Sequence, residues 1–94
     1  MEENKEITKE KLKKYFEITE KALKIAEKSI NSEKKKEAEE ILKMVNCYLS
    51  DAHHFEKQGN FVNAFGAINY AHGWLDSGAR LKIFLVTDSK LFTI

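Results

Sequence analysis

Proline is absent from this chain of 94 residues, and its four glycines all lie beyond residue 58. The first half therefore contains nothing that interrupts a helix except the polar step Asn31-Ser32, which suits a helix end followed by a new N-cap. Apolar residues recur there at alternating three- and four-residue steps, the period of an amphipathic helix. The pattern predicts long helices, and a chain of this length makes one domain.

Three helices are predicted, over residues 5–30, 33–57 and 61–84. Gly59-Asn60 separates the last two, because glycine tolerates the left-handed backbone that closes a helix and the Asn60 side chain can cap the next one. The connection is short, so the second and third helices should form an antiparallel hairpin. We therefore expect an all-α, three-helix up-down-up antiparallel bundle over residues 1–84.

The apolar face of the third helix covers a little over half of its circumference, so it should touch two neighbours. The residues predicted to be buried on this face are Phe61, Ala64, Phe65, Ala67, Ile68, Ala71, Trp74, Leu75, Gly78 and Leu81. Residues 85–94 change character, with β-branched and aromatic residues interrupted by polar ones, and are predicted to form a short non-helical C-terminal arm. Its apolar end, residues 91–94, should fold back on the bundle or dock onto another chain.

The balance of charge does not favour nucleic acid or an acidic membrane as a partner. Sixteen basic and 15 acidic residues give a net charge of +1, so no global field attracts nucleic acid or an acidic membrane. The single Cys47 cannot form an intrachain disulfide, and the first residues lack the apolar segment of a secretory signal, which favours the cytoplasm. No run approaches the roughly 18 apolar residues that cross a bilayer.

Two polar patterns are candidate sites. His72 and Asp76 lie four residues apart on the third helix, so the carboxylate could orient the imidazole as in a general base; alternatively they form a rim hydrogen bond or ion pair. No nucleophile pairs with them, so no catalytic residue is predicted. Cys47, Asp51 and His54 share one stripe of the second helix, but a stripe of two turns is too long for one zinc ion. We expect no metal and no cofactor.

The spacing of two glycines predicts a surface for partners. Gly66 and Gly73 are seven residues apart and project, with Asn69 and Ser77, from the side of the third helix opposite its core. Each glycine inside a helix costs about 0.8–1.0 kcal/mol relative to alanine, which a solvent-facing site gives no packing reason to accept. Either the two glycines arose by sequence drift that the helix tolerates, or a second copy, a partner protein or the C-terminal arm approaches this side of the helix closely. The predicted partner-binding residues are Gly66, Asn69, Gly73, Ser77, Leu91 and Phe92.

One stretch of the sequence is distinctive enough to suggest a family. The strings Tyr48-Leu49-Ser50-Asp51-Ala52, Gly59-Asn60-Phe61 and Tyr70-Ala71-His72-Gly73-Trp74-Leu75-Asp76 resemble the archaeal family catalogued as domain of unknown function 357. The ending Leu91-Phe92-Thr93 is similar to the C-terminal arm of that family. The resemblance implies a small three-helix bundle of archaeal origin with no assigned activity.

Two functions from different classes follow from these observations. The first is a non-enzymatic helical module that binds a protein partner or self-associates, for example as a homodimer. The alternative is a hydrolase or nucleic-acid-processing accessory that uses Asp51, His72 and Asp76. Convergence of those three side chains in one water-accessible pocket would favour the enzyme, and dispersal would favour the module. A simple nucleic-acid binder is a third possibility, which retention on a polyanion column would test.

Overall fold

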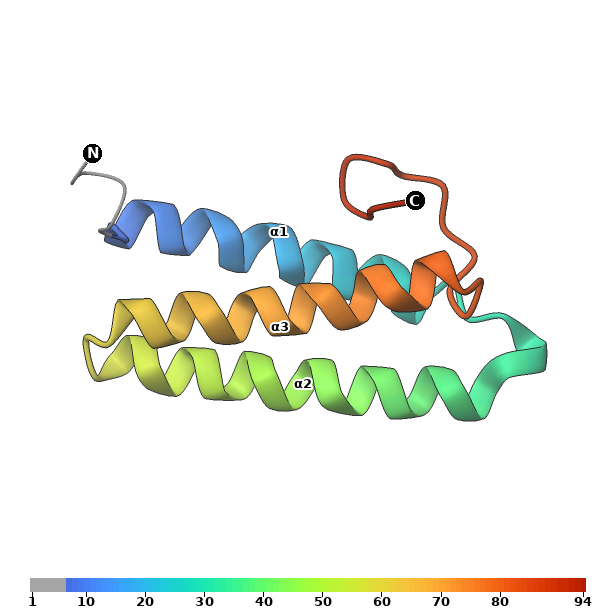
Figure 1. Ribbon diagram of the computed structural model, residues 1–94, viewed down its shortest axis with the longest axis horizontal. Helices are drawn as coiled ribbons and strands as arrows, with labels where there is room; N and C mark the ends of the chain where they lie inside the picture. The colour runs from blue at the N-terminus through green and yellow to red at the C-terminus, as the bar shows by residue number, and fades with distance from the viewer. Residues whose placement is uncertain (1–6) are drawn as a thin grey trace.

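The computed structural model describes residues 7–94, in which three α-helices follow one another in an up-down-up arrangement (Figure 1). They are α1 (Lys9–Glu27), α2 (Lys35–Lys57) and α3 (Phe61–Arg80), with a short 3-10 helix, η2 (Ser32–Lys34), before α2. The predicted all-α bundle is confirmed. None of the helices in this part of the chain is long and apolar enough to span a bilayer.

The helix starts follow from local chemistry. The hydroxyl of Thr8 accepts a hydrogen bond from the Lys11 N–H at 3.1 Å and so caps α1. Asn60 caps α3 in the same way, as predicted, because its side-chain oxygen accepts from the Asn63 N–H. Gly59 adopts φ +76°, the left-handed backbone expected at the end of α2. The start predicted for the first helix, residue 5, lies outside the described residues.

Helix α3 lies between α1 and α2 and contacts both along its length, whereas α1 and α2 have few contacts with each other (Figure 1). The core is formed by the apolar stripes of all three helices and by side chains that follow α3. Its largest fully buried members are Phe84, Phe92, Leu12, Ile68, Leu75 and Val45. The third helix therefore holds the other two together, as its wide apolar face predicts.

Two helices end earlier than predicted, and the segments that follow them contact each other. The backbone around Ile30, after α1, pairs with the backbone around Phe84, after α3, in an isolated antiparallel bridge. The Leu85 N–H donates to the Ser29 carbonyl at 2.7 Å, and the Asn31 N–H donates to the Ile83 carbonyl at 2.9 Å. α1 ends at residue 27 rather than 30, and α3 ends at residue 80 rather than 84, where the chain turns toward this bridge.

The turn after α3 brings Phe84 into the core. Lys82 takes a left-handed backbone with φ 63°, and the Ile83 and Phe84 N–H groups then donate to the carbonyl of Gly78. The Phe84 ring rests on Gly78, where an added Cβ would lie 2.5 Å from a ring carbon. Gly78 is thus the one helical glycine whose missing side chain the fold itself requires.

Two side chains predicted to be buried on α3 are not. Trp74 is 37 % exposed and Leu81 is 64 % exposed. The apolar face of α3 is wider than the area that its two neighbours cover, so residues at the margin of that face remain in contact with solvent.

Candidate partner-binding groove

An open groove of about 710 Å³ lies over the outer face of α3. We call it the α3 groove; its lining residues are Tyr48, Gly66, Asn69, Tyr70, Gly73, Trp74 and Ser77. Tyr48 comes from α2 and the other six from α3, where steps of three and four residues place them on one side of the helix. The structure thus brings together the four α3 residues that the glycine spacing singles out.

The two glycines of the groove have no role in the packing of the described residues. A Cβ atom added to Gly66 or Gly73 would meet nothing within 4 Å outside the helix's own backbone. Each nevertheless costs α3 about 0.8–1.0 kcal/mol relative to alanine. The packing of the described residues therefore does not account for either missing side chain.

Aromatic side chains form the walls of the α3 groove. The rings of Tyr48 and Tyr70 stack with centroids 5.3 Å apart and an interplanar angle of 16°. Tyr70 is 66 % exposed even so. Trp74, the only tryptophan of the chain, stands one helical turn further along α3. Tyrosine and tryptophan are enriched where proteins bind one another, because each offers a large apolar ring and a polar group at its edge.

No charged residue occurs between Phe61 and Leu75, a stretch that includes three quarters of α3. By contrast, the exposed positions of α1 are mostly Lys and Glu. A second hollow, of about 700 Å³ between α1 and α2, shows the ordinary pattern: it is lined by Glu17, Glu20, Lys21, Lys24 and Glu27 among others. Charges of both signs there are well hydrated, whereas the α3 groove presents rings and backbone to water.

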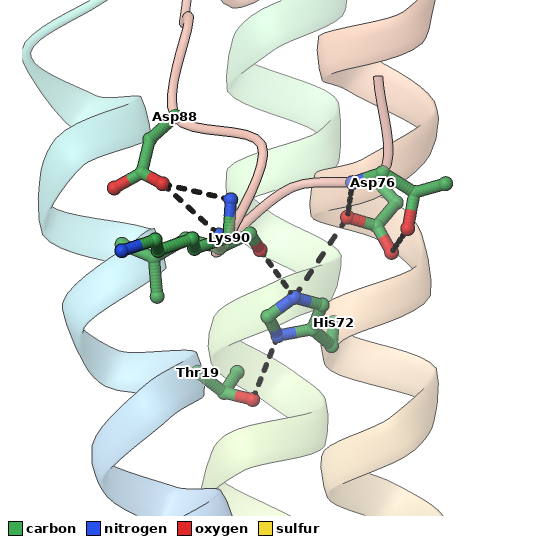
Figure 2. A network of polar contacts seen from close by, with 7 residues as sticks. Thr19, His72, Asp76, Asp88 and Lys90 are labelled. Carbon is green, nitrogen blue, oxygen red and sulfur yellow. Dashed lines mark hydrogen bonds and ion pairs between the residues drawn. The ribbon is translucent and has the colours of Figure 1, made fainter.

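His72 does not face this groove; it links α1, α3 and the C-terminal arm (Figure 2). Its Nε2 lies 2.7 Å from the carbonyl oxygen of Leu91, and its Nδ1 lies 2.9 Å from the Thr19 hydroxyl. A carbonyl can only accept, so Nε2 carries the proton and donates. In the neutral ring, the Thr19 hydroxyl then donates to Nδ1. Both ring nitrogens are engaged in holding the fold.

Asp76 fixes the end of the same arm. Its Oδ1 accepts from the Thr93 N–H at 2.9 Å, and its Oδ2 accepts from the Thr93 hydroxyl at 3.2 Å (Figure 2). The distance between Asp76 Oδ1 and His72 Nε2 is 3.7 Å, too long for a hydrogen bond. The two side chains are within ion-pair distance of each other, and both also bind the arm.

The arm docks on the side of α3 that faces α1, away from the α3 groove. A turn at Asp88, whose carboxylate accepts from the N–H groups of Lys90 and Leu91, directs the chain back toward His72 (Figure 2). Phe92 is then buried in the core and Leu91 is half-buried against it. Of the predicted partner-binding residues, these two lie on the chain's own bundle and apart from the other four.

Asp51 is not brought together with His72 and Asp76. It lies on the exposed side of α2 in a shallow hollow shared with Phe55 and Asn63, and that hollow has no residue in common with the one that contains His72 and Asp76. Within residues 7–94, no three His, Cys, Asp or Glu side chains are placed to hold a metal ion. Cys47 and His54 are both exposed on α2. The polar residues considered from the sequence are dispersed.

Several residues of the α3 groove and of the contacts around His72 were not predicted from the sequence. The sequence predicted no polar role for Thr19, although its hydroxyl, buried with the residue at 2 % exposure, meets His72. Tyr48, Tyr70 and Trp74 were not associated with the glycines, because Trp74 was predicted to be buried. The uncharged run from Phe61 to Leu75 is visible in the sequence and could have indicated the groove.

Together these features define a class: a small three-helix bundle whose C-terminal arm folds back onto its side, with an uncharged groove on its central helix. The chain belongs to the DUF357 family, described as proteins of unknown function, whose profile matches residues 14–84. This confirms the resemblance and extends it into α1, whereas Leu91-Phe92-Thr93 lies beyond the matched residues. Neither a curated protein nor a solved structure matches the chain.

Proposed function

We propose that this protein is a non-enzymatic protein–protein interaction module and that the α3 groove is its binding surface. The observation that carries the proposal is the composition of the groove: two glycines that the bundle does not need, aromatic walls and no charge, all open to solvent. A glycine floor lets a backbone approach closely, and the α3 lining from Gly66 to Ser77 extends over about three helical turns, so we propose that the groove receives an α-helix with small, uncharged residues on one face.

The alternative activity, a hydrolase or nucleic-acid-processing accessory, has less support. It requires Asp51, His72 and Asp76 to converge, but Asp51 lies in a different hollow from the other two, which are both bound to the arm. Binding of nucleic acid has no support from the groove, which contains no Lys or Arg. A cytoplasmic location and an archaeal origin belong to the same proposal, the first because the single exposed Cys47 suits a reducing compartment.

Position-specific crosslinking tests the binding surface. With Cys47→Ser as background, Ser77→Cys places a photoreactive maleimide in the α3 groove, and Ser50→Cys places the same group in the charged hollow between α1 and α2. Both serines are exposed helical positions, so they are matched. We expect the groove position alone to give a discrete protein adduct in an extract of the source organism.

The adduct must also depend on the groove itself. Adding Tyr70→Lys puts a charge on an exposed wall residue without disturbing the core and should abolish the adduct. Equal adducts from both positions, no adduct at all, or an adduct that survives Tyr70→Lys would each refute the proposal.

A further inference from the structure

We infer that the helix received by the α3 groove is α3 of a second copy, packed antiparallel about a two-fold axis that passes between Asn69 and Tyr70. This inference rests on the proposed function and specifies its partner. The arm does not compete for the groove, because His72 and Asp76 hold it on the α1 side of α3.

The residues of the groove are arranged so that α3 complements itself. In an antiparallel pair with a two-fold axis at the midpoint of residues 69 and 70, Gly66 of each chain lies opposite Gly73 of the other. The same symmetry places the exposed Val62 opposite Ser77. A two-fold interface requires this reciprocity, in which each residue meets a fixed counterpart in both directions. Glycine faces glycine twice, so the two helices can approach more closely than the usual 8–10 Å between axes.

The polar groups of the groove are also matched in this arrangement. Asn69 and Tyr70, both exposed, lie on either side of the glycine line, so at the axis each lies beside its own counterpart from the other chain. The side-chain amide can both donate and accept, and so can the phenol hydroxyl, so the two Asn69 side chains can hydrogen-bond to each other, and so can the two Tyr70 hydroxyls. The polar atoms at the centre of the contact therefore find partners when water is excluded.

Charge favours a second copy over a dissimilar helix. Residues 61–75 carry no charge, so two such faces meet without burying an unpaired ion. A helix with Lys or Glu on its contact face would lose hydration in the groove and gain no counter-ion. The net charge of +1 adds almost no repulsion between copies.

The face is large enough for a stable dimer. The bundle measures 45 × 24 × 16 Å, and α3 lies along the middle of its broad face (Figure 1). A helix of this length extends for about 30 Å. Together with the helices that flank it, such a face can bury the roughly 800 Å² per partner that specific interfaces use.

Sedimentation of the purified full chain tests the inference. We expect twice the chain mass of 10.9 kDa at about 100 μM, a concentration at which a dimer with a Kd near 1 μM is essentially complete. Asn69→Lys places like charges together at the axis and should weaken association by roughly 100-fold. Asn46→Lys makes the same change at an exposed position of α2 that lines the hollow between α1 and α2, and should leave association unchanged.

Mixing two disrupted variants provides the decisive step. At about 10 μM, where a wild-type dimer with a Kd near 1 μM still predominates, Asn69→Lys and Asn69→Asp chains should each be mostly monomeric alone and should associate when mixed, because opposite charges then meet at the axis. The emission of Trp74, the only tryptophan, reports the same event inside the groove. Association insensitive to Asn69→Lys, or no recovery on mixing, refutes this dimer. A monomeric wild-type chain also refutes it, whereas a groove-dependent adduct with a different protein in the crosslinking experiment would leave the proposed function standing.

Discussion

Replacing Gly66 and Gly73 by alanine should change stability and association in opposite directions. Each substitution inside a helix gains about 0.8–1.0 kcal/mol, and the added Cβ meets nothing within 4 Å, so the gain is not offset by a clash. The two sites are about 10 Å apart along α3, and their effects should add to about 1.6–2.0 kcal/mol. For a domain of this size, that raises the Tm of the monomer by roughly 6–16 °C.

Gly78→Ala is the matched control. It offers α3 the same gain in helix propensity, but its Cβ would lie 2.5 Å from the buried ring of Phe84 and 3.2 Å from Ile41 Cδ1. Overpacking of a buried site typically costs about 1–3 kcal/mol, so this variant should be less stable than the wild type. The comparison separates helix propensity from the space available at each glycine.

Urea unfolding followed by circular dichroism measures stability, at a dilution where the chain is monomeric. Sedimentation at high concentration then measures association, which the Gly66→Ala, Gly73→Ala pair should weaken, since two methyl groups enter the helix contact from each chain. Added stability with unchanged association would remove the case for a partner at the α3 groove. A loss of stability equal to that of Gly78→Ala would refute the account of the groove as open space.

The remaining predictions concern the arm, the turn after α3 and nucleic acid. His72→Ala leaves the buried Thr19 hydroxyl without its partner and should cost about 1–3 kcal/mol of unfolding free energy, whereas exposed His54→Ala should change it by less than about 0.5; equal urea midpoints would contradict this role of His72. Lys82→Gly relieves a left-handed backbone and should stabilise by about 1 kcal/mol, while Lys57→Gly, in the last turn of α2, should destabilise. On a polyanion column the chain should elute at or below about 50 mM salt; retention beyond about 200 mM would point to nucleic acid instead.

The number, order and direction of the helices could be predicted because their signals are local. Gly59 and Asn60 stop one helix and start the next through their own backbone and side chain. Asn31 likewise caps η2 by accepting from the Glu33 N–H. Each of these contacts joins residues within three positions, so a short window of sequence contains the whole interaction.

The helix ends and the role of His72 could not be predicted, because their causes are distant in the chain. The segments that follow α1 and α3 pair through a bridge between Ile30 and Phe84, and no property of either segment alone indicates it. His72 was interpreted as a rim partner of Asp76, and it does lie within ion-pair distance of that residue, but its hydrogen-bond partners are Thr19, 53 residues away, and the carbonyl of Leu91, 19 residues away. Hydrogen bonds of this range depend on how the helices pack.

The α3 groove was predicted in part. The spacing of Gly66 and Gly73 and the position of Asn69 and Ser77 place them on one exposed side of α3, as the structure has them. The exposure of Trp74 was not foreseen, because periodicity shows how wide an apolar face is and not how much of it the neighbouring helices cover.

The position of His72 between α1 and the arm has a consequence for partial unfolding. Because one imidazole is bonded to both segments, detachment of α1 removes the support of the arm, and the two should open as a single cooperative unit, or foldon. The α2–α3 hairpin would remain, because α3 packs more extensively against α2 than against α1. Every residue that lines the α3 groove belongs to that hairpin, so recognition at the groove would outlast an opening that undoes half of the bundle.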